Sequence, residues 1–161
     1  MPTALTLLEQ REIEAKILGP FLRAFAEKFG EEQIRLIAQE VIHDLGFQSG
    51  CMIRKSLGNN SLVELGQAVS NWQQGDSLSL EILASQENEL NFNVRRCAFA
   101  EMYDRLGLKE WGDILSCGRD AAMIQGFNPN IELKRTQTIM QGDSHCDFRY
   151  SELTKSSKNS E

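Results

Sequence analysis

The sequence contains few residues of several kinds, and each shortage excludes a class of protein. Its 161 residues include only three prolines, two histidines and four cysteines. So few prolines exclude a collagen-like or proline-rich chain, and no two cysteines have the CxxC spacing of a zinc knuckle. No apolar run reaches the roughly 18 residues of a membrane-spanning helix, and the N-terminus lacks the basic and long apolar segments of a signal peptide. We therefore expect a cytoplasmic protein with reduced thiols and no membrane partner.

Positive charge is also scarce. Lys and Arg number 17 against 23 Asp and Glu, so the formal net charge is −6. The basic residues form no block larger than the pair Arg95-Arg96, whereas phosphate binding needs clustered Lys and Arg. A nucleic-acid partner is therefore not expected. The remaining composition, 41% hydrophobic and 25% charged, is that of a globular chain long enough to form its own core.

In the first part of the chain, apolar residues recur with the spacing of an α-helix. Apolar residues recur at three- and four-residue intervals over residues 6–28 and 31–55, which predicts two helices with their apolar faces on the core. Pro20 is expected to kink the first helix or split it in two, and Gly30 to end it. The residues expected to face inward are Leu7, Leu8, Ile13, Ile17, Leu18, Phe21, Leu22, Phe25 and Phe29, followed by Ile34, Ile37, Ala38, Val41, Ile42, Leu45 and Met52.

A third helix and a sheet follow. Ser61 and Glu64 have the spacing of a capping box, which predicts a helix from that point to about Gly75. Beyond this helix, apolar and polar residues alternate, which is the period of a strand. The alternation predicts a hairpin over 78–84 and 90–94 and a second hairpin over 131–140 and 144–150. Residues 97–106 and 117–126, between the two hairpins, are expected to be helices.

The sequence thus predicts an α+β fold in which N-terminal helices pack on one face of a roughly four-stranded antiparallel sheet, with helices inserted between two hairpins. We expect a single hydrolase-like domain over residues 1–150. Residues 1–75 would be its helical scaffold, and residues 76–150 its sheet and site. The polar segment 151–161 is expected to be a disordered tail.

Residues with reactive side chains concentrate in the C-terminal third, where three of the four cysteines lie. Ser116 is a plausible N-cap, and it would place Cys117 in the first turn of the next helix. Helix N-termini carry partial positive charge, which lowers a thiol pKa and would activate Cys117 as a thiolate. The alternative is a small residue packed where the helix meets its loop.

The segment around Cys146 presents two different faces. Because neighbours in a strand point to opposite sides, Cys146 is expected inward, and His145, Asp147 and Arg149 outward. His145 and Cys146 can then share a site only if a bulge or the strand end redirects one of them. The outward residues are equally consistent with a solvated polar face.

Arg96 follows the alternating run Leu90, Phe92, Val94, which places it on the apolar face of its strand. A guanidinium there needs an anionic partner. Two partners fit this position: the carboxylate of a substrate, or a structural acid such as Glu101 or Asp120.

A metal site is an alternative use of the same residues. Cys97, Cys117, Cys146 and His145 supply the atoms of a Cys₃His zinc site, but their spacing matches no zinc finger or knuckle. We therefore expect neither a metal nor a cofactor. A site assembled from these scattered positions stays open as an alternative.

Several segments resemble the L-2-amino-thiazoline-4-carboxylic acid hydrolase family. They are Arg96–Tyr103, Leu115–Asp120, Gly126–Pro129 and Gly142–Tyr150, together with Arg11–Ala15 and Gly58–Leu62. The similarity covers about residues 8–150, and its most specific parts are the three late cysteines and the ending HCDFRY. The resemblance implies a hydrolase that opens a cyclic isothiourea to a carbamoyl-cysteine, with a carboxylate-bearing small molecule as its partner.

The resemblance and the residue types together give two sets of candidates. The catalytic candidates are Cys117, Cys146, His145, Asp147 and Asp120, and the substrate-binding candidates are Arg96, Arg149, Cys97 and Asn128. A thiolate can attack the ring carbon, or a water can attack it with Asp120 or Asp147 as base. Two non-enzymatic functions stay open: a small-molecule-binding domain similar in layout to the 4-vinyl reductase type, and a metal or iron–sulfur carrier. The sequence also leaves homo-oligomerisation open.

Overall fold

The computed structural model describes residues 4–153. Its first half contains α1 (Leu7–Phe29), α2 (Glu31–Leu57), α3 (Leu62–Asn71), the 3₁₀ turn η1 (Gln74–Asp76), β1 (Leu78–Ser85) and β2 (Glu89–Cys97). Its second half contains α4 (Ala98–Arg105), α5 (Lys109–Gly112), the π-helical turn η2 (Asp113–Cys117), α6 (Arg119–Phe127), β3 (Ile131–Lys134), the 3₁₀ turn η3 (Ile139–Gln141) and β4 (Cys146–Glu152). The predicted α+β class is confirmed.

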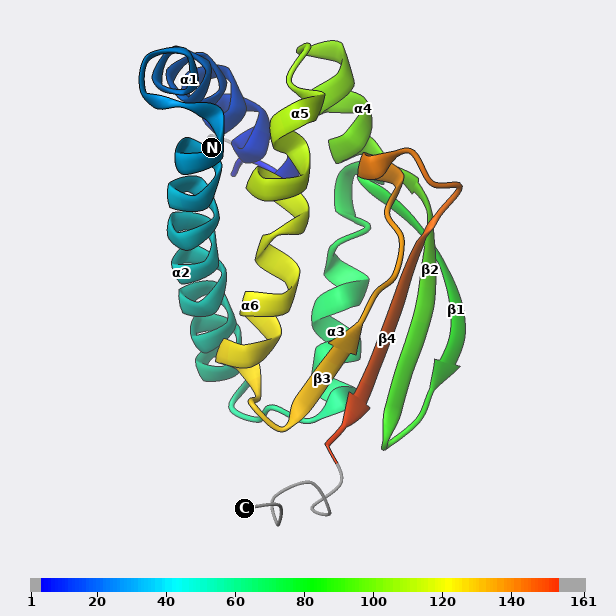
Figure 1. Cartoon of the computed structure of the whole chain (residues 1–161). Coiled ribbons are helices and arrows are strands. Elements are labelled where there is room, and N and C mark those ends of the chain that lie inside the picture. Colours follow the sequence, from blue (N-terminus) through cyan, green and yellow to red (C-terminus); the bar gives the residue numbers. More distant parts are fainter. Residues whose placement is uncertain (1–3, 154–161) are drawn as a thin grey trace.

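The four strands form one antiparallel sheet in the order β1-β2-β4-β3. The helices lie on one side of this sheet, with α2 outermost and α6 between α2 and the sheet (Figure 1). The inward face carries the register pairs Phe92–Phe148 and Leu90–Tyr150. The rings of Phe92 and Phe148 stack 4.9 Å apart, so this face forms the centre of the core.

A β-bulge interrupts the alternation near the end of β2. Ser79 pairs with Arg96 and Leu80 with Val94, so Arg95 has no opposite partner on β1. One extra residue shifts every later side chain to the other face of the strand. Arg96 therefore points outward, and Cys97, the next residue, turns toward the helices.

Helices α2 and α6 pack with their backbones in close contact. Gly46 and Gly50 of α2 face α6, and Gly126 of α6 faces α2. A Cβ at Gly50 would overlap the carbonyl oxygen of Met123, and one at Gly126 would overlap that of Phe47. Glycines therefore form the part of the inner face of α2 that contacts α6.

This packing explains why the prediction for the first two helices was partly wrong. Ile34, Ala38 and Ile42 are buried as expected, whereas most of the large apolar residues expected inward lie on the outer face. On α1 the buried residues are Ala15 and Gly19. The exposed residues include Leu7, Ile13, Ile17, Leu18, Phe21, Phe25 and Phe29 on α1, and Ile37, Val41, Leu45 and Met52 on α2.

Several boundaries also differ from prediction. Pro20 does not split α1, which is one helix from a Thr6–Glu9 capping box to Gly30. The predicted strand over 131–140 ends at Lys134, because the backbone N–H groups of Thr136 and Gln137 donate to the Asp147 carboxylate instead of to a neighbouring strand. The predicted Ser61 cap is confirmed.

Strand β4 extends two residues into the predicted tail, and residues 154–161 of that tail lie outside the described residues. Over residues 4–153, none of the helices combines the length and the apolar character needed to cross a bilayer.

Candidate active site

A partly open cavity of about 240 Å³ lies between the helices and the inward face of the sheet. Its lining residues come from elements that are far apart in the sequence, namely α1, α2, β2, η2, α6 and β4. Only folding brings them together. Most of the wall is apolar, with Trp72, Phe99, Met123 and Phe148 among its residues. Charged side chains interrupt the apolar wall in two places. One contains Asp120 and Arg135, and the other contains Arg11 and Arg119.

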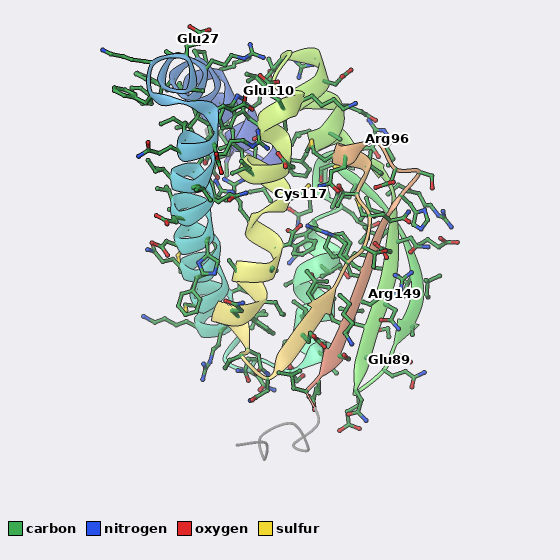
Figure 2. All side chains as sticks on the ribbon, viewed as in Figure 1. Glu27, Glu89, Arg96, Glu110, Cys117 and Arg149 are labelled. Carbon is green, nitrogen blue, oxygen red and sulfur yellow. The ribbon has the colours of Figure 1, made fainter. Side chains whose placement is uncertain are left out.

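The three late cysteines all line this cavity. Cys97 lies at the end of β2, Cys117 at the end of η2 and Cys146 at the start of β4. All three are free thiols, and Cys51 lies exposed on α2. Figure 2 shows Cys117 between the helices and the sheet. The fold thus brings together three thiols that are far apart in the sequence.

The local structure at Cys117 differs from the prediction of a helix N-terminus. Cys117 is the last residue of a π-helical turn that connects α5 to α6, and the N–H of Gly118 donates to the carbonyl of Asp113, five residues back. A thiol inside a continuous helical segment gains no free N–H groups. Burial, followed by the nearby Asp120 carboxylate, raises the pKa of Cys117. The expected activation by a helix N-terminus was therefore wrong.

Cys97, in contrast to Cys117, does lie at the N-terminus of a helix. It is the N-cap of α4, and its Sγ accepts the N–H of Ala100 at 3.4 Å. Burial nevertheless outweighs this hydrogen bond and raises the pKa of Cys97 to about 11. Cys146 resembles it, since its Sγ accepts the N–H of Ile139 at 3.3 Å while burial raises its pKa. All three cavity thiols are therefore protonated at neutral pH in the unliganded protein.

Asp120 and Arg135 form an ion pair in the cavity wall. The Arg135 guanidinium also donates to the carbonyl of Cys117 at 3.2 Å and lies 5.0 Å from the centre of the Phe148 ring. Burial raises the pKa of Asp120 despite this cation. Burial lowers the pKa of Arg135, but Asp120 together with the nearby cysteines Cys117 and Cys146 outweighs it, and the net shift is upward. The pair places a proton acceptor close to the thiol of Cys117.

A second charged group lies in the wall where α1 approaches α6. Arg11 and Arg119 both line the cavity, and each side chain is only 14% exposed. Both contact the same acid, Glu14, at 2.8 Å and 3.4 Å respectively. Burial and then the Arg11 charge lower the pKa of Arg119. Two guanidinium groups thus share one carboxylate beside the cavity.

Five predicted site residues lie outside the cavity wall, four of them on or near β4 and in the loop after α6, and the fifth, Arg96, at the end of β2. The His145 ring contacts Gln137 and Ser144, and Arg149 donates to the carbonyl of Phe92 and to Asn93. The reason is the alternation of β4, which turns His145, Asp147 and Arg149 away from Cys146, as the sequence predicted. Asp147 instead holds Thr136 and Gln137, and Asn128 links two loops by donating to the carbonyl of Asn60 at 2.8 Å.

Arg96 is the clearest correction. The prediction placed it on the apolar face, whereas its side chain is 44% exposed. It pairs with Glu101 at 2.7 Å and with Asp76 at 3.1 Å. Figure 2 shows it at the upper end of the sheet, away from Cys117. The bulge at Arg95 is the cause, and the structural alternative of a pair with Glu101 is the one observed.

The proposed metal set is not assembled. His145 is turned away from the three thiols by strand alternation, and residues 4–153 contain no group of three His, Cys, Asp or Glu side chains arranged to hold a metal ion.

Three cavity arginines were not among the predicted site residues. Arg119 lies within the conspicuous segment Leu115–Asp120, and Arg11 within Arg11–Ala15, so both belong to segments that carried the resemblance. No sequence pattern marks Arg135, because it follows β3 in a segment without regular structure.

Comparison with known proteins gives a family match and a set of similar solved structures, two of which are informative about the fold. The sequence model of the L-2-amino-thiazoline-4-carboxylic acid hydrolase family matches residues 10–150. No curated protein matches the chain. The phenol-responsive sensory domain of the transcription activator PoxR, solved with phenol, has a TM-score of 0.56 at 11% identity, covering 93% of this chain and 78% of that one.

The second similar structure is subunit 3 of a trafficking protein particle complex from Naegleria fowleri, covalently bound to palmitic acid. Its TM-score is 0.54 at 10% identity, covering 91% of this chain and 98% of that one. At such identities the two structures support the fold alone.

Proposed function

Because the chain belongs to the L-2-amino-thiazoline-4-carboxylic acid hydrolase family, we propose that it hydrolyses the ring of a small cyclic isothiourea such as L-2-amino-thiazoline-4-carboxylate. The observation that carries the proposal is the partly open cavity, whose wall contains thiols, a carboxylate and guanidinium groups. Its volume of about 240 Å³ is below the roughly 300–1,000 Å³ of pockets for drug-sized ligands. It therefore suits a substrate with few atoms.

The reaction needs an attack on one carbon and a proton for one nitrogen. The ring carbon bonded to sulfur and to two nitrogens is electrophilic. Water adds to this carbon, its bond to the ring nitrogen breaks, and the nitrogen takes up a proton, so the product is a carbamoyl-cysteine. One water is consumed, and no oxidant or reductant is required.

Asp120 is the proposed base in this reaction. A carboxylate whose pKa is raised by burial accepts a proton more readily than an ordinary aspartate does. Arg135 opposes this effect of burial by favouring the ionised carboxylate, and it holds Asp120 in the cavity wall. The proton that Asp120 takes from the attacking group is then available for the departing ring nitrogen.

Two nucleophiles are compatible with this base. In the direct route Asp120 takes a proton from water. In the covalent route it takes the proton of Cys117, the thiolate attacks the ring carbon, the ring nitrogen departs, and water then expels the thiolate. The raised pKa of Cys117 makes such a base necessary, since the free thiol is protonated.

The test is turnover of L-2-amino-thiazoline-4-carboxylate by the purified protein, followed by mass spectrometry of the product. Asp120→Asn should lower kcat by about 10²- to 10⁴-fold, the usual contribution of a general base. Cys117→Ser separates the routes, because a loss of at least about 10²-fold is expected for a nucleophile and little change for direct water attack. Cys51→Ser is the matched control and should retain activity. Absence of ring opening by the wild-type protein would refute the proposal.

A second candidate function is ligand binding without turnover. The largely apolar wall favours it, and the similar PoxR domain is described as phenol-responsive. The same assay distinguishes the two, because a pure binding domain would bind the cyclic compound and return it unchanged.

A further inference from the structure

The two arginines beside Glu14 have more positive charge than the protein neutralises. Arg11 donates through Nη1 to both oxygens of Glu14, at 2.8 Å. Arg119 reaches the same acid at 3.4 Å through Nη2 and donates its Nε–H to the carbonyl of Leu115. One carboxylate thus serves two guanidinium groups, each of which carries five N–H donors.

Burial makes this surplus costly. With both arginine side chains only 14% exposed, water can hydrate them only in part, and a second nearby anion would stabilise both. Burial, and after it the like charge of Arg11, lowers the pKa of Arg119. The other buried cation of the cavity, Arg135, already has its own acid in Asp120. The uncompensated charge is therefore localised at Arg11 and Arg119.

We propose that Arg11 and Arg119 form the binding site for the carboxylate of a small-molecule ligand in the cavity. The inference rests on the proposed function for its choice of ligand and names the residues that recognise it. Arg11 and Arg119 thereby take the carboxylate-binding role that the sequence predicted for Arg96, which pairs with Glu101 and Asp76 outside the cavity. A ligand held here by its carboxylate would present the rest of its ring toward Asp120 and Cys117, which lie in the same wall.

The experiment measures binding without turnover. Thiazolidine-4-carboxylate and its carboxamide, which lack the electrophilic ring carbon, are titrated calorimetrically into the full-length protein. The wild type should bind the acid at least about 10-fold more tightly than the amide, the scale of one charge-assisted hydrogen bond. Arg11→Gln should remove most of this preference and leave amide binding unchanged.

Glu14→Gln provides a test with the opposite sign. It removes the acid that competes with the ligand, so the affinity for the carboxylate should rise several-fold while the affinity for the amide stays constant. A purely structural role for the three residues predicts lower stability in this variant and an unchanged ratio of acid to amide affinity. Arg105→Gln is the matched control, because Arg105 of α4 also pairs with an acid of α1, Glu12, but does so outside the cavity wall.

The outcomes separate this site from the proposed function. Preference for the acid in a protein without ring-opening activity would refute the function and retain the binding site. Ring opening of the acid and of its amide at equal rates would retain the function and refute the site. Equal or undetectable binding of both compounds to the wild type would also refute it.

A second inference comes from the outer surface of α1 and α2. Ile13, Ile17, Phe21, Phe25 and Phe29 recur every four residues along α1, and each is about half exposed. Phe21, Phe25 and Phe29 form a ladder with ring centres 6.0 and 6.3 Å apart. Leu36, Ile37, Val41 and Leu45 are similarly exposed on α2. Both helices therefore carry a row of large apolar residues on their outer face.

We propose that this surface, the nine residues just named, is the interface with a second copy of the chain. A half-exposed residue of this size leaves roughly 80–100 Å² of surface in water, so the nine together approach the roughly 800 Å² that each partner buries in a stable interface. The exposed acids Glu31, Glu32, Glu40 and Asp44 accompany this surface on α2. Such acids disfavour an anionic membrane as the partner.

The test is the molar mass in solution, measured by light scattering across a wide range of protein concentration. We expect a dimer for the wild type, and a monomer for Phe25→Glu and for Val41→Glu, each with an unchanged circular dichroism spectrum. Ile82→Glu, at an exposed apolar residue of the sheet, is the control and should stay dimeric. A monomeric wild type, dimeric variants at both positions, or binding of the wild type to anionic lipid vesicles in place of dimerisation would overturn the inference.

Discussion

At the residue scale, the chemistry of the cavity depends on the protonation of its thiols. Burial raises the pKa of Cys97, Cys117 and Cys146 in spite of favourable contacts such as the Ala100 N–H at Cys97. A protonated thiol is a weak nucleophile. The three cavity thiols are therefore unreactive unless a base removes the proton.

Thiol reactivity tests this directly. At neutral pH a small disulfide reagent should modify Cys51 at least about 10-fold faster than the three cavity thiols, because Cys51 is exposed and the others are shielded and protonated. Peptide mapping of the partly modified protein identifies the reacted residue. The Cys51→Ser variant should lose the fast phase, and a fast phase that persists there would show that a cavity thiol is activated.

Arg96 gives a second prediction at this scale. Its exposed pairs with Glu101 and Asp76 belong to the class of surface ion pairs that contribute little to stability. Arg96→Lys should therefore change the melting temperature little and leave the ratio of acid to amide binding as in the wild type. If this variant selectively lost binding of the acid, Arg96 would be the residue that binds the ligand carboxylate.

At the scale of the elements, the contact between α2 and α6 depends on glycine. These two helices form the wall opposite the sheet, and Gly46 at their contact itself lines the cavity. Because the backbones touch, a small change in side-chain size at this contact is transmitted to the position of α6, and so to Cys117 and Asp120 at its start.

Gly50→Ala should destabilise the protein by about 1–3 kcal/mol or more, the cost of overpacking, because the new methyl group would overlap the backbone of Met123. Gly66→Ala is the matched control. Its Cβ would find Leu90 at 4.0 Å and nothing nearer, so the better helix propensity should stabilise by about 0.5–1 kcal/mol. Chemical denaturation measures both. Equal effects of the two substitutions would contradict the close packing.

At the scale of the whole molecule, several buried acidic groups keep their protons in the folded state. Burial raises the pKa of Cys97 from 9.0 to about 11 and that of Tyr103 from 10.0 to about 12. The folded state then binds protons more tightly than the unfolded state at alkaline pH. The stability that these groups contribute is fully present below their unfolded pKa values and is lost as the pH rises through the folded ones.

The free energy of unfolding should therefore fall as the pH rises from about 9 to about 11. Cys97 alone accounts for at most roughly 2–3 kcal/mol of this fall, since one pKa unit corresponds to about 1.4 kcal/mol. Urea denaturation at a series of pH values measures it, and Cys97→Ser should flatten the dependence. A stability that stays constant up to pH 11 would contradict the burial of these groups.

The sequence by itself determined the features that depend on local chemistry. The helical and strand periods predicted the α+β class, Ser61 and Glu64 predicted a cap that the structure contains, and the alternation along β4 placed Cys146 inward and His145 outward. Each follows from neighbours along the chain, where hydrophobic period and hydrogen-bonding residues act at short range. The family resemblance likewise followed from short segments.

Only the tertiary structure decided which faces are buried and which side chains meet. The bulge at Arg95 reversed the orientation of Arg96, and the glycine contact of α2 with α6 turned the large residues of α2 outward. The grouping of Arg11, Arg119 and Arg135 around the thiols joins α1, α6 and the segment after β3. Such contacts depend on packing between elements that are distant in sequence. The spacing of apolar residues within one helix or strand does not show which other element packs against it.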